Sequence, residues 1–203
     1  YAHFKLLEPA SWIKEDEKLG DPQKLGPCGG DPKGQNKELM TGAVTKITGG
    51  SKLHLKIQET IYHPGHYRVA QAINSPTELP LDPQVTTKDS EKGPWSVSAA
   101  IQSSPQIPVL ADGLFVHSER PTGPMPPFEA DVQLPNISCR KCTLQVVQFM
   151  ADHGYSAQVK RLGIPDRWIE HGSQKELYAE CGFHDLALIA PVRVESEGSR
   201  CRD

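Results

Sequence analysis

The sequence predicts an all-β protein: an antiparallel β-sandwich with long loops and one short helix near the C-terminus. Glycine and proline are abundant, at 17 and 18 of 203 residues, which suits many short strands joined by turns. Between the turn residues, short runs alternate between apolar and polar side chains. In 53–59, for example, Leu53, Leu55 and Ile57 are separated by polar residues. Such alternation is typical of strands with one buried face.

Strands are expected where such runs end at glycine, proline or other turn residues, over residues 3–9, 41–47, 53–59, 67–73, 95–98, 109–116, 130–134, 143–150 and 186–189. The first ends at a proline, which indicates an edge strand. Gly49-Gly50 predicts a hairpin between the second and third. A Cys-x-x-Cys turn is expected to join the seventh strand to the eighth.

One domain is expected over residues 3–190, followed by a polar tail, 191–203, without regular structure. Near the end of the domain, Ser173 and Glu176 form a capping box that predicts the start of a short helix. Gly182 is a natural stop for that helix.

The charge distribution excludes some classes of partner. The net charge is -3 with mixed signs, so neither nucleic acid nor an anionic membrane is indicated. No apolar run reaches the length needed to span a bilayer. We expect a monomer.

The five cysteines indicate disulfides in an exported protein rather than a metal or redox site. Cys139 and Cys142 form the Cys-x-x-Cys pair, but no second pair at zinc spacing follows. A strand-like run follows the pair, whereas a thioredoxin-like redox site opens a helix. Cys28, Cys139, Cys142 and Cys181 are the disulfide candidates, with three pairings open, and Cys201 is left over in the tail.

The turn His63-Pro64-Gly65-His66 is the most prominent candidate for chemistry. Pro64 and Gly65 force a bend between two strand-like runs, which places two imidazoles at the rim of a sheet. Neutral imidazole is a common metal ligand and a possible general base. The alternative interpretation is that both histidines are solvated turn residues.

A third histidine, His3, lies near the start of the sequence. Tyr1-Ala2 reads like the end of a signal-peptide cleavage site. Cleavage there would make His3 the first residue of a secreted or periplasmic protein. With Tyr1-Ala2 retained, an X-X-His terminus could instead chelate Cu(II) through the amine, two amides and the imidazole.

Several motifs together resemble the lytic polysaccharide monooxygenase-like proteins. The resemblance covers about residues 3–153 and rests on His3 after Ala2, Gly20-Asp21-Pro22-Gln23-Lys24, Pro27-Cys28-Gly29-Gly30, Glu59-Thr60-Ile61 before the HPGHYR turn, Leu110-Ala111-Asp112-Gly113, and Leu134-Pro135-Asn136 before Cys139-x-x-Cys142-Thr143-Leu144-Gln145.

This resemblance implies an immunoglobulin/fibronectin-like sandwich that holds one copper ion in a histidine brace. His3 would supply its amine and imidazole and His63 the third nitrogen, while His66 is the alternative ligand or a group that orients bound oxygen. Tyr178 or Phe183 would shield the axial position. The implied reaction is oxidative cleavage of a chitin- or cellulose-type polysaccharide with an external electron donor.

A second resemblance covers a short segment only. Residues 162–182 look like the C-terminal region of 1-deoxy-D-xylulose-5-phosphate synthase, a thiamine-dependent enzyme of the cytoplasm. The chain is far too short for that synthase and shows none of its thiamine-diphosphate motifs, so its activity is not carried over. A recombined or chimeric gene would explain the join.

Two other functions compete with the copper enzyme. A non-catalytic carbohydrate- or copper-binding module would use Tyr62 and Tyr67 to stack on sugars, although on a strand one of these tyrosines is expected to be buried. A hydrolase has little support, because Asp152-His153 and His117-Ser118 come without a nucleophile elbow. His54 alternates with leucines and is expected to face solvent.

Overall fold

The computed structural model describes residues 4–15, 40–89, 91, 94–151, 158–162 and 187–196. Apart from the short 3₁₀ turn η2 (Pro76–Glu78), its regular structure is β-strand, so the all-β prediction is confirmed. The strands are β1 (Phe4–Glu8), β2 (Val44–Ile47), β3 (Lys52–Glu59), β4 (Gly65–Ala72), β5 (Val85–Lys88), β6 (Trp95–Gln102), β7 (Val109–His117), β8 (Phe128–Gln133), β9 (Cys139–Met150), β10 (Gln158–Leu162) and β11 (Ala187–Ser196).

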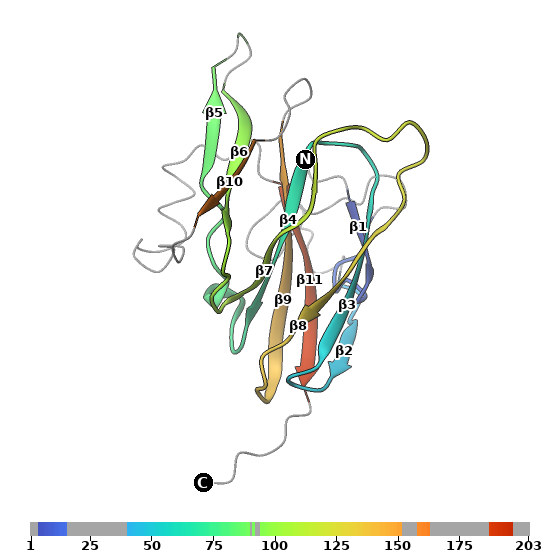
Figure 1. Ribbon diagram of the computed structural model, residues 1–203. Helices are drawn as coiled ribbons and strands as arrows, with labels where there is room; N and C mark the ends of the chain where they lie inside the picture. The colour runs from blue at the N-terminus through green and yellow to red at the C-terminus, as the bar shows by residue number, and fades with distance from the viewer. Residues whose placement is uncertain are drawn as a thin grey trace.

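The strands form three sheets. The largest has the order β2-β11-β9-β4-β7, and the two smaller ones have the orders β1-β3-β8 and β10-β6-β5. In Figure 1 the five-stranded sheet stands between the other two. Most neighbours are antiparallel, but β11 pairs with β2 and β10 with β6 in parallel. The immunoglobulin/fibronectin-like strand arrangement remains a prediction, whereas the expected edge position of the first strand is confirmed.

The main core lies between the β1-β3-β8 sheet and one face of the five-stranded sheet. In β3, alternate residues are buried, because successive side chains of a strand point to opposite faces. Complete burial of one such apolar side chain stabilises the fold by roughly 1.5–3 kcal/mol. The residues that form this core include Phe4, Leu53, Leu55, Ile57, Tyr67, Val69, Leu144 and Val146.

The central sheet is covered on both faces. Every residue of β4 is buried, the pattern expected of a strand with protein on each side. A smaller apolar cluster of Ala99, Phe149 and Ala151, with Val85 packed against it, joins β9 to the β5–β6 pair. Arg68 is also buried and donates from Nη1 to the Leu81 carbonyl oxygen at 2.9 Å.

The predicted hairpin across Gly49-Gly50 is wrong. The second strand pairs with β11, and β3 pairs with β1 and β8, so this turn carries the chain from one sheet to another. Gly50 adopts a φ of 76°, and a Cβ at Gly49 would collide with the Ile137 carbonyl oxygen. The glycines were a correct turn signal, but the partner of each strand is decided by distant residues.

The predicted Cys-x-x-Cys turn is also wrong. Cys139 and Cys142 lie inside β9 rather than in a turn, and they form a disulfide with their Cα atoms 5.8 Å apart. β8 and β9 belong to different sheets.

β11 extends to Ser196, into the segment for which no regular structure was predicted. The predicted helix after Ser173 lies outside the described residues.

Candidate functional site

The turn between β3 and β4 is built as a bend that packs against β9. The Pro64 carbonyl oxygen accepts a hydrogen bond from the Ala151 amide at 2.7 Å. A Cβ at Gly65 would collide with the Phe149 carbonyl oxygen. Glycine is therefore required at Gly65 because β9 approaches closely. The φ of Gly65 is not positive, so its backbone conformation does not itself require glycine.

The last residue of β3, Glu59, is the centre of a buried polar cluster beside this turn. Its side chain is almost fully buried. Its Oε1 atom accepts from the Tyr67 hydroxyl at 2.9 Å and from Gln148 Nε2 at 2.5 Å, and His117 Nε2 lies 3.1 Å away. These three donors supply the hydrogen bonds that a buried carboxylate needs. We call Glu59, Tyr67, His117 and Gln148 the carboxylate cluster.

The ring of His117 has a hydrogen-bond acceptor beside each nitrogen. Nδ1 lies 2.6 Å from the Phe115 carbonyl oxygen, and Nε2 lies 2.6 Å from the His63 carbonyl oxygen. A neutral imidazole can donate from only one nitrogen, whereas an imidazolium donates from both. The geometry therefore assigns the charged form to His117, with the Glu59 carboxylate as its counter-ion.

The electrostatics agree with this assignment. Burial alone lowers the pKa of His117, but the hydrogen bond and charge of Glu59, together with the two carbonyl groups, raise the pKa above the ordinary value on balance. Burial, the charge of Glu59 and its hydrogen bond raise the pKa of the Tyr67 hydroxyl well above its usual range. Tyr67 is thus a hydrogen-bond donor at every physiological pH.

Aromatic rings surround the imidazolium. His117 stacks on Phe128 with ring centroids 5.2 Å apart, and Tyr62 packs at 5.8 Å. Phe115 adopts a φ of 53°, an uncommon conformation for a non-glycine residue, and this residue provides the carbonyl group that faces Nδ1. Such packing favours a cation over the ring face. Burial, followed by the charges of Glu59 and Glu119, raises the pKa of Tyr62.

The polar atoms of the carboxylate cluster are bonded to one another and to the backbone, so the cluster does not offer a nucleophile to a substrate. Both nitrogens of His117 and the Oε1 atom of Glu59 are engaged by protein groups. Because the members come from β3, β4, β7 and β9, the cluster connects the β1-β3-β8 sheet to the central sheet. Its chemistry is that of a charged, hydrogen-bonded clamp at one end of the main core.

The structure does not assemble the predicted histidine centre from the residues it describes. His63 contributes its backbone carbonyl to His117, and His66 is buried with its ring 5.2 Å from that of Phe149. Neither is the solvated turn residue of the alternative interpretation, because both are partly or fully buried. Within the described ranges, no three His, Cys, Asp or Glu side chains come together as a metal site. His3 lies outside those ranges.

Only some of the other predicted site residues lie in the part of the chain that the structure describes. Tyr178, Phe183, Cys28 and Cys181 lie outside the described residues. Tyr67 is in the core, so it cannot stack on a sugar at the surface. His54 faces solvent on β3 as predicted, between Asp131 at 3.1 Å and Glu129 at 3.7 Å.

A second polar group is buried on the other face of the central sheet. Besides Leu81, the guanidinium of Arg68 contacts Gln145 Oε1 at 3.5 Å. Burial raises the pKa of Asp82, and the positive charge of Arg68 opposes that shift. A cation therefore helps to hold the loop after η2 against β4 and β9.

Sequence reasoning did not predict the carboxylate cluster, and it named Tyr67 only as a candidate for stacking on sugars. Glu59 was noted only as part of a motif, and His117 only as a neighbour of Ser118. One usable signal was present: Gln145 and Gln148 interrupt the otherwise apolar strand β9 at positions that a strand on a covered sheet would bury. Buried amides require partners, so they point to a polar network.

Comparison with known proteins finds short stretches of similarity to one enzyme. The 1-deoxy-D-xylulose-5-phosphate synthase of Cytophaga hutchinsonii is 58% identical over 48 residues, which are 24% of this chain and 8% of the synthase. The synthase of Bacteroides thetaiotaomicron is 51% identical over 52 residues, covering 26% of this chain and 8% of that protein. That of Syntrophotalea carbinolica is 31% identical over 97 residues, covering 48% and 14%.

The chain thus spans only 8 to 14% of the length of these curated relatives. No family model matches the chain, and no solved structure matches it. In the part of the chain that the structure describes, no helix is long and apolar enough to cross a membrane.

These findings overturn the predicted function. The relatives bear the name of the synthase that the second resemblance identified, and none of those cited is named for copper or polysaccharide. The copper-dependent polysaccharide monooxygenase, its copper cofactor and its histidine brace are therefore wrong predictions. The alternative carbohydrate- or copper-binding module gains no better support. The physical reason for the error is that the turn histidines serve packing and a backbone hydrogen bond.

Proposed function

We propose that this chain is an accessory partner of a 1-deoxy-D-xylulose-5-phosphate synthase, built from an all-β domain and a synthase-like segment. The observation that carries the proposal is the concentration of similarity: 58% identity over 48 residues, which amount to 8% of the synthase. The proposal concerns association with a synthase and does not extend to catalysis by this chain.

A segment of 48 residues is near the lower limit of length for a chain that buries a stable core by itself. A short segment gains its stability from contacts with the rest of the chain that carries it. Identity at more than half of its positions preserves many of the side chains that would make those contacts. The same segment on another chain therefore offers a surface that complements a synthase.

The described domain supports a binding role. The ionisable groups of the carboxylate cluster bind one another and two backbone carbonyls. These contacts fix the position of β3 and β7. In this proposal the catalytic groups are those of the synthase. The all-β domain then acts as a rigid platform for the shared segment.

The test mixes the full chain with the Cytophaga hutchinsonii synthase at equal micromolar concentrations. Size-exclusion chromatography with light scattering measures the mass of the species formed. The control is a full-length variant in which the order of residues 163–182 is scrambled at constant composition. A parallel assay follows formation of 1-deoxy-D-xylulose 5-phosphate with the chain alone, the synthase alone and both together.

A complex with the original chain, absent with the scrambled variant, is the expected result. The chain alone should form no product. Failure of the original chain to associate with the synthase would refute the accessory role, and product formation by the chain alone would show that it is itself a catalyst.

A further inference from the structure

A pocket lies at the opposite end of the β4–β9 pair from Tyr67 and Gln148 of the carboxylate cluster, near the register pair of Ala72 and Thr143. Its volume is about 350 Å³, within the usual range for sites that hold small molecules. It is lined by Trp12, Met40, Gly42, Ala43, Val44, Asn74, Pro76, Lys141 and Thr143. Most of these side chains are apolar.

The walls of this pocket are fixed by hydrogen bonds between separate segments. The Thr41 amide donates to the Trp12 carbonyl oxygen at 2.7 Å, and the Thr41 hydroxyl donates to the Ser11 carbonyl oxygen at 2.9 Å. Ile13 and Met40 form a β-bridge. The Asn74 side chain donates to Glu78 Oε1 at 3.0 Å. The pocket is therefore built largely in advance of any ligand.

The interior of the pocket is open and its rim is apolar. Met40 is 50% exposed and Val44 is 38% exposed, so both leave apolar surface open to a ligand. A Cβ placed at Gly42 would meet no atom within 4 Å. The indole ring of Trp12 provides a flat apolar wall of the kind that packs against planar ligands.

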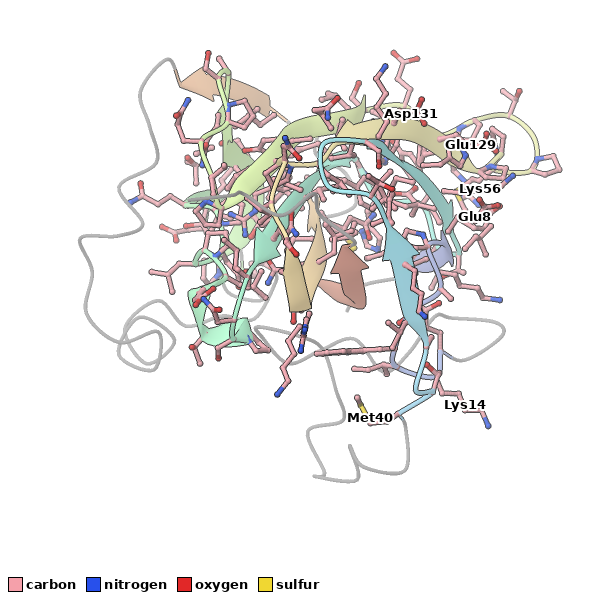
Figure 2. The ribbon with its side chains drawn as sticks, turned by 90° about the horizontal axis from the view of Figure 1, so that it is seen from below. Glu8, Lys14, Met40, Lys56, Glu129 and Asp131 are labelled. Carbon is pink, nitrogen blue, oxygen red and sulfur yellow. A yellow bond between two sulfur atoms is a disulfide. The ribbon has the colours of Figure 1, made fainter. Side chains whose placement is uncertain are left out.

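The described lining of the pocket includes one cationic side chain. Lys141 is the charged residue among the described lining residues, and its side chain is exposed. Figure 2 shows Lys14 at the same corner of the molecule as Met40, well away from Lys56, Glu129 and Asp131. The hydrogen bonds that Glu78 accepts from Asn74 and Ile73 lower its pKa, so this carboxylate is negatively charged beside the lining residue Asn74.

β11 lies between two of the strands that line the pocket. Arg193 of β11 is paired with Val44 on one side and with Thr143 on the other. Val44 and Thr143 both line the pocket, so Arg193 occupies the register position between two lining residues. A site with one cation and an aromatic wall recognises a flat organic anion by charge-assisted hydrogen bonds and stacking.

We propose that this pocket binds a small, planar organic carboxylate, with its apolar body against Trp12 and its carboxylate at Lys141. The proposal is independent of the synthase partnership. The Lys141 ammonium donates to the carboxylate oxygens, and the apolar walls cover the body of the ligand. A neutral ligand of the same shape keeps the apolar contacts and loses the charge-assisted hydrogen bond.

The test uses 2-naphthoate as the probe and the full-length protein, with isothermal titration calorimetry as the measurement. The neutral 2-naphthamide is the matched control ligand. Lys141→Gln is the test variant. Lys56→Gln is the control variant, because it makes the same change in net charge at a position well away from Met40 of the pocket (Figure 2). Circular dichroism checks that each variant is folded.

We expect 2-naphthoate to bind with a Kd below about 1 mM and the amide to bind at least about tenfold more weakly. Lys141→Gln should raise the Kd for the carboxylate about tenfold and leave that for the amide unchanged, while Lys56→Gln should change neither. Absence of binding, equal affinity for the two ligands, or equal effects of Lys141→Gln and Lys56→Gln would overturn the proposal. If a variant fails to fold, the comparison of the two ligands on the unmodified protein still decides.

Discussion

His117 Nε2 lies 3.1 Å from the Oε1 atom of Glu59, although the residues belong to different sheets. Glu59 ends β3 in the β1-β3-β8 sheet, and His117 ends β7 at the edge of the central sheet. Tyr67 and Gln148 of the central sheet donate to the same oxygen. At this end of the main core, an ion pair and hydrogen bonds join the two sheets, next to the apolar side chains of the core.

Replacing Glu59 by Gln should destabilise the protein strongly. The substitution keeps the shape of the side chain but removes the counter-ion of a largely buried imidazolium and gives three donors a poorer acceptor. We expect the free energy of unfolding to fall by about 3 kcal/mol, measured by urea denaturation at pH 7. Glu129→Gln, at an exposed ion pair with Lys56, is the matched control and should leave the transition unchanged. Equal effects of the two substitutions would show that the buried ion pair contributes no more to the free energy of unfolding than the exposed one.

Stability should fall as the pH rises through the folded-state pKa of His117. That pKa is raised above the ordinary value of about 6.5, so over this interval the folded state binds more protons than the unfolded state. The free energy of unfolding therefore decreases with increasing pH there, and the contribution of His117 is complete only below the unfolded-state pKa. Urea midpoints collected across this pH range should show the slope, and His117→Gln should flatten it. A slope of opposite sign would mean that His117 is neutral in the folded protein.

Gly65→Ala should be poorly tolerated. The added methyl group would collide with the Phe149 carbonyl oxygen, and because that oxygen belongs to the backbone of β9, relief requires movement of a strand. A loss of about 2–4 kcal/mol in the free energy of unfolding is expected, measured by thermal and urea denaturation. Gly123→Ala is the control, since its added methyl group would meet no atom within 4 Å. A variant Gly65→Ala as stable as Gly123→Ala would contradict the close approach of β9.

The Cys139–Cys142 disulfide should contribute modestly to stability. It closes a loop with only two intervening residues, and the entropic effect of a cross-link grows with loop length. Reduction, or substitution of both cysteines by serine, should therefore lower the free energy of unfolding by at most about 2 kcal/mol. Peptide mass mapping without reductant checks the pairing. Recovery of both cysteines in alkylated form would contradict it.

The sequence predicted individual strands better than their neighbours. Alternation in 53–59 identified β3 and the exposure of His54, because periodicity is a local property of a strand. The choice of partner for β2 and β3 depends on contacts with β11, β1 and β8, none of which a local pattern encodes. The turn glycines were recognised, yet the hairpin assigned to them does not exist.

The candidate site was harder to predict than the strands. The turn at His63 was located correctly, but the partners of its backbone carbonyl and of Glu59 come from β4, β7 and β9. His117 is one of 8 histidines, and its sequence neighbours do not reveal that its ring lies between two carbonyl oxygens and a carboxylate. Only the assembled sheets bring these groups together.

The most direct test of the carboxylate cluster is the protonation state of His117. Two-dimensional ¹H–¹⁵N correlation spectra of the imidazole ring, recorded from pH 6 to pH 9 and assigned with His117→Gln, distinguish a doubly protonated ring from either neutral tautomer. We predict that both Nδ1 and Nε2 of His117 carry protons at pH 7, as their contacts with Phe115, His63 and Glu59 require. A ring with one unprotonated nitrogen at pH 7 would contradict the charged clamp and leave His117 free to act as a base.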